Sequence, residues 1–229
     1  MTGRRFSARR PIRLSDADAA GRLRHDAIAR YLQDVAADDV LDAGWTPDEH
    51  IWVVRRTVLD VLQPFLGDTA VELTTWCGAV AGSAAARRTS VVGDRGGHIE
   101  AEMIWIHLGS DLQPQRLGDR FLSIYGASAE GRRASTRLEL PGPAGDATVA
   151  PWTLRSTDID QLGHVNNAAY WIAVEEHFAL TAPHRAVLEY RRPLDLGDPV
   201  ELRRSDGALW FAVDGDVRAA AVVRLGKRL

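Results

Sequence analysis

The chain has 229 residues, of which 45% are hydrophobic and 26% charged, so it is long enough to bury a core and too apolar for wholesale disorder. Its formal net charge of −3 offers no basic excess for a nucleic-acid backbone, and its single cysteine, Cys77, excludes an intramolecular disulfide and a multi-cysteine zinc site. No apolar run approaches the ~20 residues of a membrane span. Residues 1–10 carry charge without an apolar stretch behind them, so we expect no secretory signal and a cytoplasmic protein.

The N-terminal part of the chain contains an acidic turn that leads into a helix. The turn reads Asp-x-Asp-x-x-Gly over residues 16–21. Apolar residues then recur at steps of three and four, which predicts a helix with a buried face, capped by Asp26 and stopped by Gly44. These apolar residues are Ile28, Tyr31, Leu32, Val35, Ala36 and Val40.

Strands are expected to follow this first helix. The runs 51–61, 67–73, 84–92 and 99–108 are rich in β-branched residues and are separated by Gly-Asp or Gly-rich turns, a pattern typical of antiparallel strands. The mixed pattern of 110–137 indicates a helix or an ordered crossover.

The same order returns after a Pro- and Gly-rich linker at 138–146. The Asp-x-Asp-x-x-Gly turn recurs at 158–163, shifted by 142 positions from the first copy. The helix pattern after it is apolar on nearly all sides, which indicates a buried helix. Its apolar residues are Ala169, Tyr170, Ile172, Ala173, Val174 and Phe178, and further strands are expected at 186–192, 197–202, 208–213 and 217–225.

The sequence therefore predicts two tandem repeats, 1–137 and 147–229, joined by the linker 138–146. The second repeat is too short to fold well alone. We expect the sheets of the two repeats to pair edge to edge into one continuous sheet, which also protects their edges. The predicted class is α+β.

Four strings of residues carry a resemblance to a known family. They are Ile51-Trp-Val-Val-Arg-Arg56, Gly67-Asp68-Thr69, Asp158-Ile-Asp160-Gln-Leu-Gly-His164-Val-Asn-Asn167 and Leu188-Glu-Tyr-Arg-Arg192. With the doubled layout, the chain resembles the acyl-acyl-carrier-protein (acyl-ACP) thioesterases of plants and bacteria. The resemblance implies a double hot-dog fold, in which each repeat wraps an antiparallel sheet around a long helix. It also implies hydrolysis of an acyl-ACP thioester, which releases free fatty acid in fatty acid biosynthesis.

The resemblance extends to site residues. Asp160 matches the family's acid and His164 its histidine, so we expect both to be catalytic. Leu162 stands where the family has an asparagine, and Pro193 and Leu194 stand where it has a Glu or Cys. The turn itself is closer to that of single hot-dog acyl-CoA thioesterases, which rely mainly on the Asp.

The residue types suit thioester hydrolysis. The positive end of a helix favours the carboxylate of Asp160 by roughly 0.3 to 1 kcal/mol, and that carboxylate can orient or deprotonate water or attack the carbonyl. Substrate-binding roles are expected for Gly163, Val165, Asn166 and Asn167, with backbone N–H groups of this stretch directed at the carbonyl oxygen.

Each candidate also has a plain structural interpretation. Asp160 can be a turn residue only, and Asn167 a helix cap only. Glu175 or Glu176 in the second helix can act as an alternative base, or can instead meet solvent or an arginine. Core packing is the expected role of Cys77.

The first copy of the turn is expected to be degenerate. Asp18 and Gly21 remain, but Arg22-Leu-Arg-His25 replaces His-Val-Asn-Asn. We therefore expect one active site, in the second repeat, with the first repeat supplying walls of the substrate tunnel.

The expected partner is an acyl carrier protein with an acyl-phosphopantetheine group, or acyl-CoA, and not a nucleic acid or a membrane. We expect no cofactor and no metal, and a monomer or homodimer. Arginine pairs at 55–56, 87–88, 191–192 and 203–204 either form a stripe for an acidic carrier protein or pair with acids on the sheet surface. The alternative functions are an acyl-CoA thioesterase and a non-catalytic acyl-binding hot-dog protein.

Overall fold

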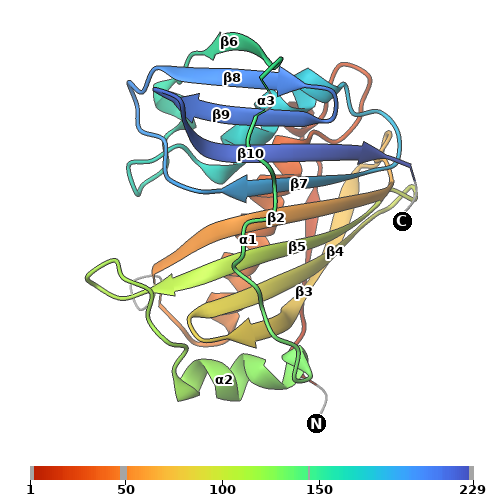
Figure 1. Cartoon of the computed structure of the whole chain (residues 1–229). Coiled ribbons are helices and arrows are strands. Elements are labelled where there is room, and N and C mark those ends of the chain that lie inside the picture. The colour runs from red at the N-terminus through yellow and green to blue at the C-terminus, as the bar shows by residue number, and fades with distance from the viewer. Residues whose placement is uncertain (1–2, 47–50, 144, 227–229) are drawn as a thin grey trace.

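An antiparallel sheet with two helices packed on one face dominates the computed structural model, which describes residues 3–46, 51–143 and 145–226 (Figure 1). The helices are α1 (His25–Asp42), α2 (Asp119–Tyr125) and α3 (Asn167–Phe178). The strands are β1 (Phe6–Pro11), β2 (Ile51–Gln63), β3 (Ala70–Ala81), β4 (Ala84–Gly93), β5 (His98–Leu108), β6 (Thr148–Trp152), β7 (His184–Tyr190), β8 (Val200–Ser205), β9 (Ala208–Val213) and β10 (Asp216–Leu225).

The two repeats share one sheet, with the strand order β1-β3-β4-β5-β2-β7-β10-β9-β8-β6. They meet where β2 pairs with β7 in antiparallel register from Arg56–Glu189 to Val61–His184. The edge-to-edge pairing and the α+β class expected from the sequence are both confirmed. The pairing covers one edge of each repeat, so the exposed edges of the sheet are β1 and β6.

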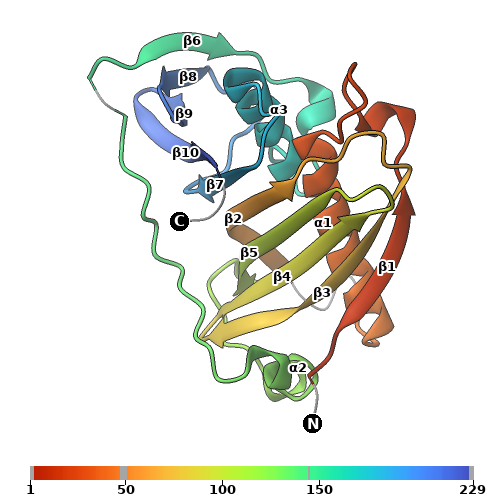
Figure 2. The same cartoon turned by 90° about the vertical axis from the view of Figure 1, so that its right-hand side faces the viewer.

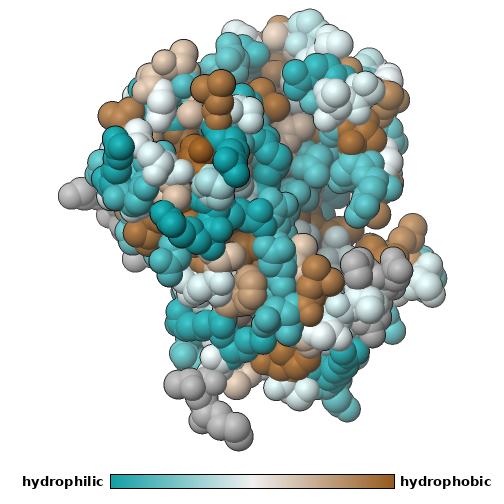
Figure 3. Space-filling view, turned by 180° about the vertical axis from the view of Figure 1, so that it is seen from behind, coloured by the Kyte–Doolittle hydropathy of each residue, from teal (hydrophilic) through white to brown (hydrophobic). Residues whose placement is uncertain are grey.

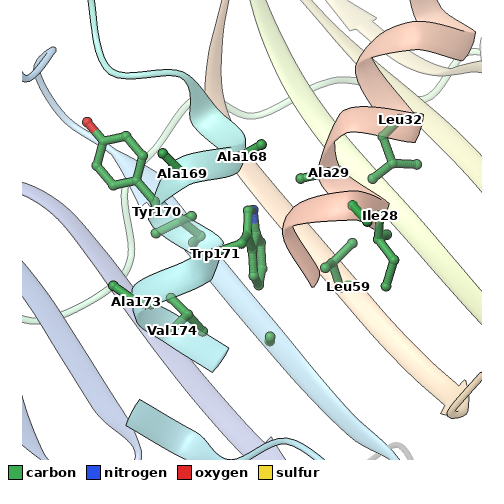
Figure 4. Close-up of a cluster of buried hydrophobic side chains, with 14 of the residues drawn as sticks. Ile28, Ala29, Leu32, Leu59, Ala168, Ala169, Tyr170, Trp171, Ala173 and Val174 are labelled. Carbon is green, nitrogen blue, oxygen red and sulfur yellow. The ribbon is translucent and has the colours of Figure 1, made fainter. Parts of the chain in front are cut away.

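Helices α1 and α3 lie side by side against the inner face of this sheet (Figures 1 and 2). Figure 4 shows the small side chains of Ala29 and Ala168 where the two helices approach, and Trp171 filling the space between them. Trp171 has no exposed surface, and α3 is buried on most of its circumference, as its all-round apolar pattern predicts. The core of the two repeats is therefore continuous across the helix pair.

The structure confirms the predicted C-terminal end of α1 and contradicts its predicted N-cap. Gly44 has a φ of +78° and its N–H donates to the carbonyl of Leu41, so it ends the helix as expected. The predicted cap Asp26 is wrong, because Asp26 already lies in the first helical turn, where it pairs with Arg24 and Arg30.

The segment between the repeats forms α2 and then crosses the outer face of the sheet as an extended linker (Figures 1 and 2). The carboxylate of Glu189, which has no exposed surface, accepts hydrogen bonds from the backbone N–H groups of Glu139 at 2.7 Å and Leu140 at 3.1 Å. The guanidinium of Arg191 donates to the carbonyl of Leu140 at 2.7 Å. The Glu-Tyr-Arg string therefore anchors the linker to the sheet.

Other sequence expectations about burial can be checked in the same structure. Cys77 is buried in β3, and burial raises the pKa of its thiol, so its assignment to core packing is confirmed.

Across the described ranges, no helix is long and apolar enough to cross a membrane. The helix side of the molecule is covered mostly by hydrophilic residues, with apolar ones in small scattered groups (Figure 3).

A buried carboxylate before α1 gives a first testable prediction. Asp16 accepts hydrogen bonds from the hydroxyl of Tyr31 at 2.6 Å and from the N–H of Arg13 at 2.9 Å. Burial alone would raise the pKa of Asp16, but these bonds and the charge of Arg30 bring it below its usual range. The ionised carboxylate thus stabilises the fold above the unfolded-state pKa of about 3.9, and this contribution is lost as the pH falls through the lower folded value.

Replacing Tyr31 by Phe should therefore lower the free energy of unfolding by about 1.5 to 3 kcal/mol at neutral pH. The deficit should shrink as the pH falls from about 4 toward 2, because Asp16 becomes protonated in both proteins. Urea unfolding of Tyr31→Phe and wild type at several pH values measures this, and a deficit that does not vary with pH would contradict it.

Candidate active site

The turn before α3 brings the predicted acid and histidine together. The N–H of Asp160 donates to the carbonyl of His164 at 2.9 Å, and the N–H of Gly163 donates back to the carbonyl of Asp160 at 3.0 Å. Gly163 has a φ of +83°, a conformation that a residue with a Cβ rarely adopts. The half-buried carboxylate of Asp160 also accepts the N–H of Leu162 at 2.9 Å, which fixes its orientation.

His164 has a partner that the sequence did not reveal. Its Nδ1 lies 2.6 Å from a carboxylate oxygen of Asp195, in the loop after β7, and the two residues also form a β-bridge. A carboxylate on Nδ1 fixes the tautomer and leaves Nε2 available as a base. Both side chains are exposed, by 48% and 61%, so substrate can reach the pair. The only signal of this partner in the sequence is the acid itself, two residues beyond Pro193.

The expected free backbone donors are mostly occupied. The N–H groups of Gly163, Val165 and Asn166 donate to carbonyl oxygens of the turn and of the loop after β7, at 3.0, 2.9 and 2.8 Å. The expectation that these three amides point at a substrate carbonyl is therefore wrong, because they close the turn instead. Asn167 is the first residue of α3, whose first-turn N–H groups have no acceptor within the helix.

The N-cap of α3 is Asn166, one residue before Asn167, the cap that one of the sequence interpretations named. The side chain of Asn166, not of Asn167, accepts the N–H of Ala168 at 2.8 Å. The amide of Asn166 also meets the amide of Gln33 in α1 at 3.3 to 3.4 Å. Val165 is buried, so its side chain belongs to the core.

The turn before α1 repeats this construction with different chemistry. Asp18 and Gly21 make the same backbone hydrogen bonds, and Gly21 has a φ of +78°. The guanidinium of Arg22 lies 3.0 Å from the carboxylate of Asp18. Burial opposes ionisation of Asp18, but hydrogen bonds from the N–H groups of Arg22 and Ala20 and the charge of Arg22 lower its pKa. The charge of the Asp18 carboxylate is therefore neutralised by Arg22 of the same turn.

A second cluster joins the start of α1 to α3. The carboxylate of Glu175 contacts a histidine rather than an arginine, because it lies 3.0 Å from Nδ1 of His25. Nε2 of His25 lies 3.0 Å from Nε2 of His184, at the start of β7. Burial, together with the neighbouring His25, lowers the pKa of His184. Glu176 is exposed on the same helix.

The arginine pairs do not form one stripe. Arg87 faces α1 and pairs with Asp39 at 2.7 Å, while Arg88 pairs with Glu102 at 3.1 Å. Arg192 and Arg203 likewise meet acids, and Arg56 lies 4.0 Å from the carboxylate of Glu139 in the linker. Pairing with acids is thus the better description of Arg87, Arg88, Arg192 and Arg203. No group of three or more His, Cys, Asp or Glu side chains is placed to hold a metal ion in the part of the chain that the structure describes.

Models of two domains match the chain. The model described as the acyl-ACP thioesterase N-terminal domain matches residues 3–125, and the model described as the acyl-ACP thioesterase C-terminal domain matches residues 143–212. The uncharacterized protein Rv2001 of Mycobacterium tuberculosis is 40% identical over 219 residues, which cover 92% of this chain and 88% of that protein.

Solved structures share the fold over the whole chain. The 12:0-ACP thioesterase from Umbellularia californica has a TM-score of 0.77 at 19% identity, with 99% of each chain covered. An acyl-ACP thioesterase from Bacteroides thetaiotaomicron has a TM-score of 0.74 at 18% identity, with 96% of this chain and 98% of that chain covered. At these identities the likeness establishes the double hot-dog fold.

Proposed function

This chain belongs to the acyl-ACP thioesterase family, and we propose that it hydrolyses the thioester of a fatty acyl-acyl carrier protein to release free fatty acid. It is a thioester hydrolase built on the tandem hot-dog fold. The observation that carries the assignment of the site is the turn before α3. There the carboxylate of Asp160 and the His164–Asp195 pair are held within one hydrogen-bonded loop system at a helix start.

We assign the hydrolytic step to Asp160, with His164 as its partner. The carboxylate of Asp160 orients a water molecule and takes its proton as the water oxygen attacks the carbonyl carbon of the thioester. The N–H of Asn167 donates to the carbonyl oxygen, where one such donor is typically worth ~3 to 4 kcal/mol in the transition state. The C–S bond then breaks, and the proton that Asp160 took from the water passes through Nε2 of His164 to the leaving sulfur, so that water and thioester give acid and thiol.

The departures from the family's polar set have structural reasons that support this assignment. Leu194 has no exposed surface and belongs to the core, so a polar side chain there would lie unsatisfied. Asp195, one residue further, supplies the carboxylate that His164 contacts. Leu162 is 57% exposed beside Asp160, in a position to contact the apolar part of a substrate or carrier.

The donor of the acyl group is tested by one assay. Purified protein is given the same acyl chain on acyl carrier protein and on CoA, and free thiol is measured. We expect faster release from the carrier protein. Faster release from CoA would make the chain an acyl-CoA thioesterase, and tight acyl binding with no thiol from either donor would make it a non-catalytic acyl-binding protein.

The His164–Asp195 pair gives a second prediction. Replacing Asp195 by Asn removes the acceptor for Nδ1–H, so the imidazole loses its fixed tautomer, and kcat should fall by up to about 100-fold with little change in KM. Asp206→Asn, a charge loss at an exposed residue of the β8–β9 turn, is the control and should leave kcat unchanged. Equal kcat values in the two variants would exclude a role for Asp195 in positioning His164.

A further inference from the structure

Each of the helices α1 and α3 places one side chain beside the start of the other. Gln33 of α1 contacts Asn166, the N-cap of α3, and Glu175 of α3 contacts His25, the first residue of α1. Gln33 and Glu175 are 142 positions apart, the offset that also relates His25 to Asn167. The two cross-helix contacts are therefore copies of one arrangement, and they differ in the residue that the opposing helix supplies.

The N-terminal copy shows where an oxygen atom binds at such a helix start. One oxygen of the Glu175 carboxylate accepts the backbone N–H of His25 at 3.1 Å, and the other lies 3.0 Å from Nδ1 of the same residue. The first N–H groups of a helix have no acceptor within it and lie at the positive end of its dipole. The carboxylate oxygen thus lies where a substrate carbonyl oxygen would accept the same N–H, so this copy is filled by its own side chain.

The C-terminal copy leaves the corresponding N–H open. Asn167 is the first residue of α3, and none of the residues that the structure describes accepts its backbone N–H. The side chain opposite is the amide of Gln33, which is uncharged and can donate hydrogen bonds, whereas an ionised glutamate can only accept them. A carbonyl oxygen at this helix start therefore meets a donor on the opposing helix instead of a competing acceptor.

The contacts of Gln33 hold its amide at this helix start. Nε2 of Gln33 donates to Oδ1 of Asn166 at 3.3 Å, and Oε1 of Gln33 accepts from Nδ2 of Asn166 at 3.4 Å. Oδ1 of Asn166 in turn accepts the N–H of Ala168 at 2.8 Å, so the amide pair is fixed to the first turn of α3. An NH₂ group carries two hydrogens, which leaves the second hydrogen of Gln33 Nε2 for a ligand.

We infer that Gln33, which belongs to the N-terminal repeat, is a catalytic residue of the site in the C-terminal repeat. This inference rests on the proposed function. As the water oxygen bonds to the thioester carbonyl carbon, negative charge develops on the carbonyl oxygen, and the N–H of Asn167 and the Nε2–H of Gln33 both donate to it. Donors that are held in place before the reaction stabilise this charge without reorganising. The site is thus built from both repeats, while Glu175 fills the equivalent place in the N-terminal copy.

Replacing Gln33 by Glu separates catalysis from packing. Glutamate keeps the length of glutamine and an oxygen for Nδ2 of Asn166, but it has no hydrogen for the carbonyl oxygen. It also places a carboxylate where Glu175 lies in the other copy. We expect kcat on acyl-ACP to fall at least 100-fold, while Tm stays at or above the wild-type value because a carboxylate is favourable at a helix start.

Replacing Gln33 by Met removes the donor without adding a charge, and it serves as the second variant if Gln33→Glu does not fold. Here kcat should fall at least tenfold while KM changes less than twofold. The matched control is Gln63→Met, which removes the same amide from the exposed end of β2 and should keep the wild-type kcat. Steady-state release of thiol from acyl-ACP measures both constants, and thermal unfolding of each variant reports whether the fold is intact.

An infrared readout detects the hydrogen bond itself. Acyl-ACP labelled with carbon-13 at the thioester carbonyl is bound to the slow Asp160→Ala variant, and the carbonyl stretching frequency is recorded. Because a hydrogen-bond donor lowers this frequency, adding Gln33→Met should raise it, whereas adding Gln63→Met should not.

Two results would count against these assignments, and they differ. A kcat for Gln33→Met or Gln33→Glu within twofold of the Gln63→Met value would overturn the role of Gln33 and leave the proposed function standing. Wild-type protein that releases no thiol from any acyl thioester would overturn both.

Discussion

Replacing Asp160 by Ala is expected to lower kcat for hydrolysis of acyl-ACP by about 100-fold. The carboxylate is the group that we assign to the water, and its orientation is fixed by the N–H of Leu162 and by the closed turn around Gly163. Alanine keeps the backbone hydrogen bonds of the turn, so the loss should appear in kcat with KM nearly unchanged. Steady-state release of free thiol from acyl-ACP measures both constants.

The equivalent change in the first repeat is the informative comparison. Asp18 occupies the same place in its turn, but its charge is neutralised by Arg22 at 3.0 Å. Asp18→Ala should therefore reduce kcat far less than Asp160→Ala. Equal losses in the two variants would show that the turns are functionally equivalent, and would refute the assignment of the principal site to the second repeat.

Replacing Glu189 by Gln is expected to have the largest effect on stability, a loss of about 3 kcal/mol in the free energy of unfolding at neutral pH. The buried carboxylate accepts two backbone N–H groups of the linker, those of Glu139 and Leu140. A glutamine can accept one of them, but its NH₂ group then faces the other donor and stays buried without a partner. The negative charge also offsets burial of Arg55, whose pKa burial lowers and Glu189 raises.

Urea unfolding of the Glu189→Gln variant measures this loss, and Glu201→Gln on strand β8 of the same sheet is its control. Glu201 pairs with Arg203 at 3.3 Å and its side chain is 45% exposed, so its replacement should cost less than about 0.5 kcal/mol. A Glu189→Gln variant as stable as the control would mean that the linker is not anchored by this carboxylate.

Most of the fold could be predicted from the sequence because the same order of turn, helix and strands occurs twice in the chain. The repeated turn at a constant offset, the alternating strands and a second helix without a polar face led to two repeats with paired sheets. The errors are local: Asp26 was expected to cap α1, and Asn167 was one of the expected caps of α3. Several polar residues lie within one turn of each helix start, and tertiary contacts decide which of them becomes the cap.

The site could be predicted only where its residues are close in sequence. Asp160 and His164 share one turn, whereas Asp195 reaches His164 from another loop and Glu175 reaches His25 across the two repeats. Such pairs depend on how the repeats pack, which residue types and spacing do not specify. The spacing of Glu175 and Gln33, equal to the repeat offset, is the one sequence signal that could have pointed to the second cluster.

Release of free thiol from an acyl-acyl carrier protein, followed alongside release of fatty acid, tests the central claim most directly. The account predicts that wild-type protein yields thiol and fatty acid in equal amounts over many turnovers, and that the Asp160→Ala variant is slower by about 100-fold. Protein that binds the acyl chain tightly but liberates neither product would contradict it.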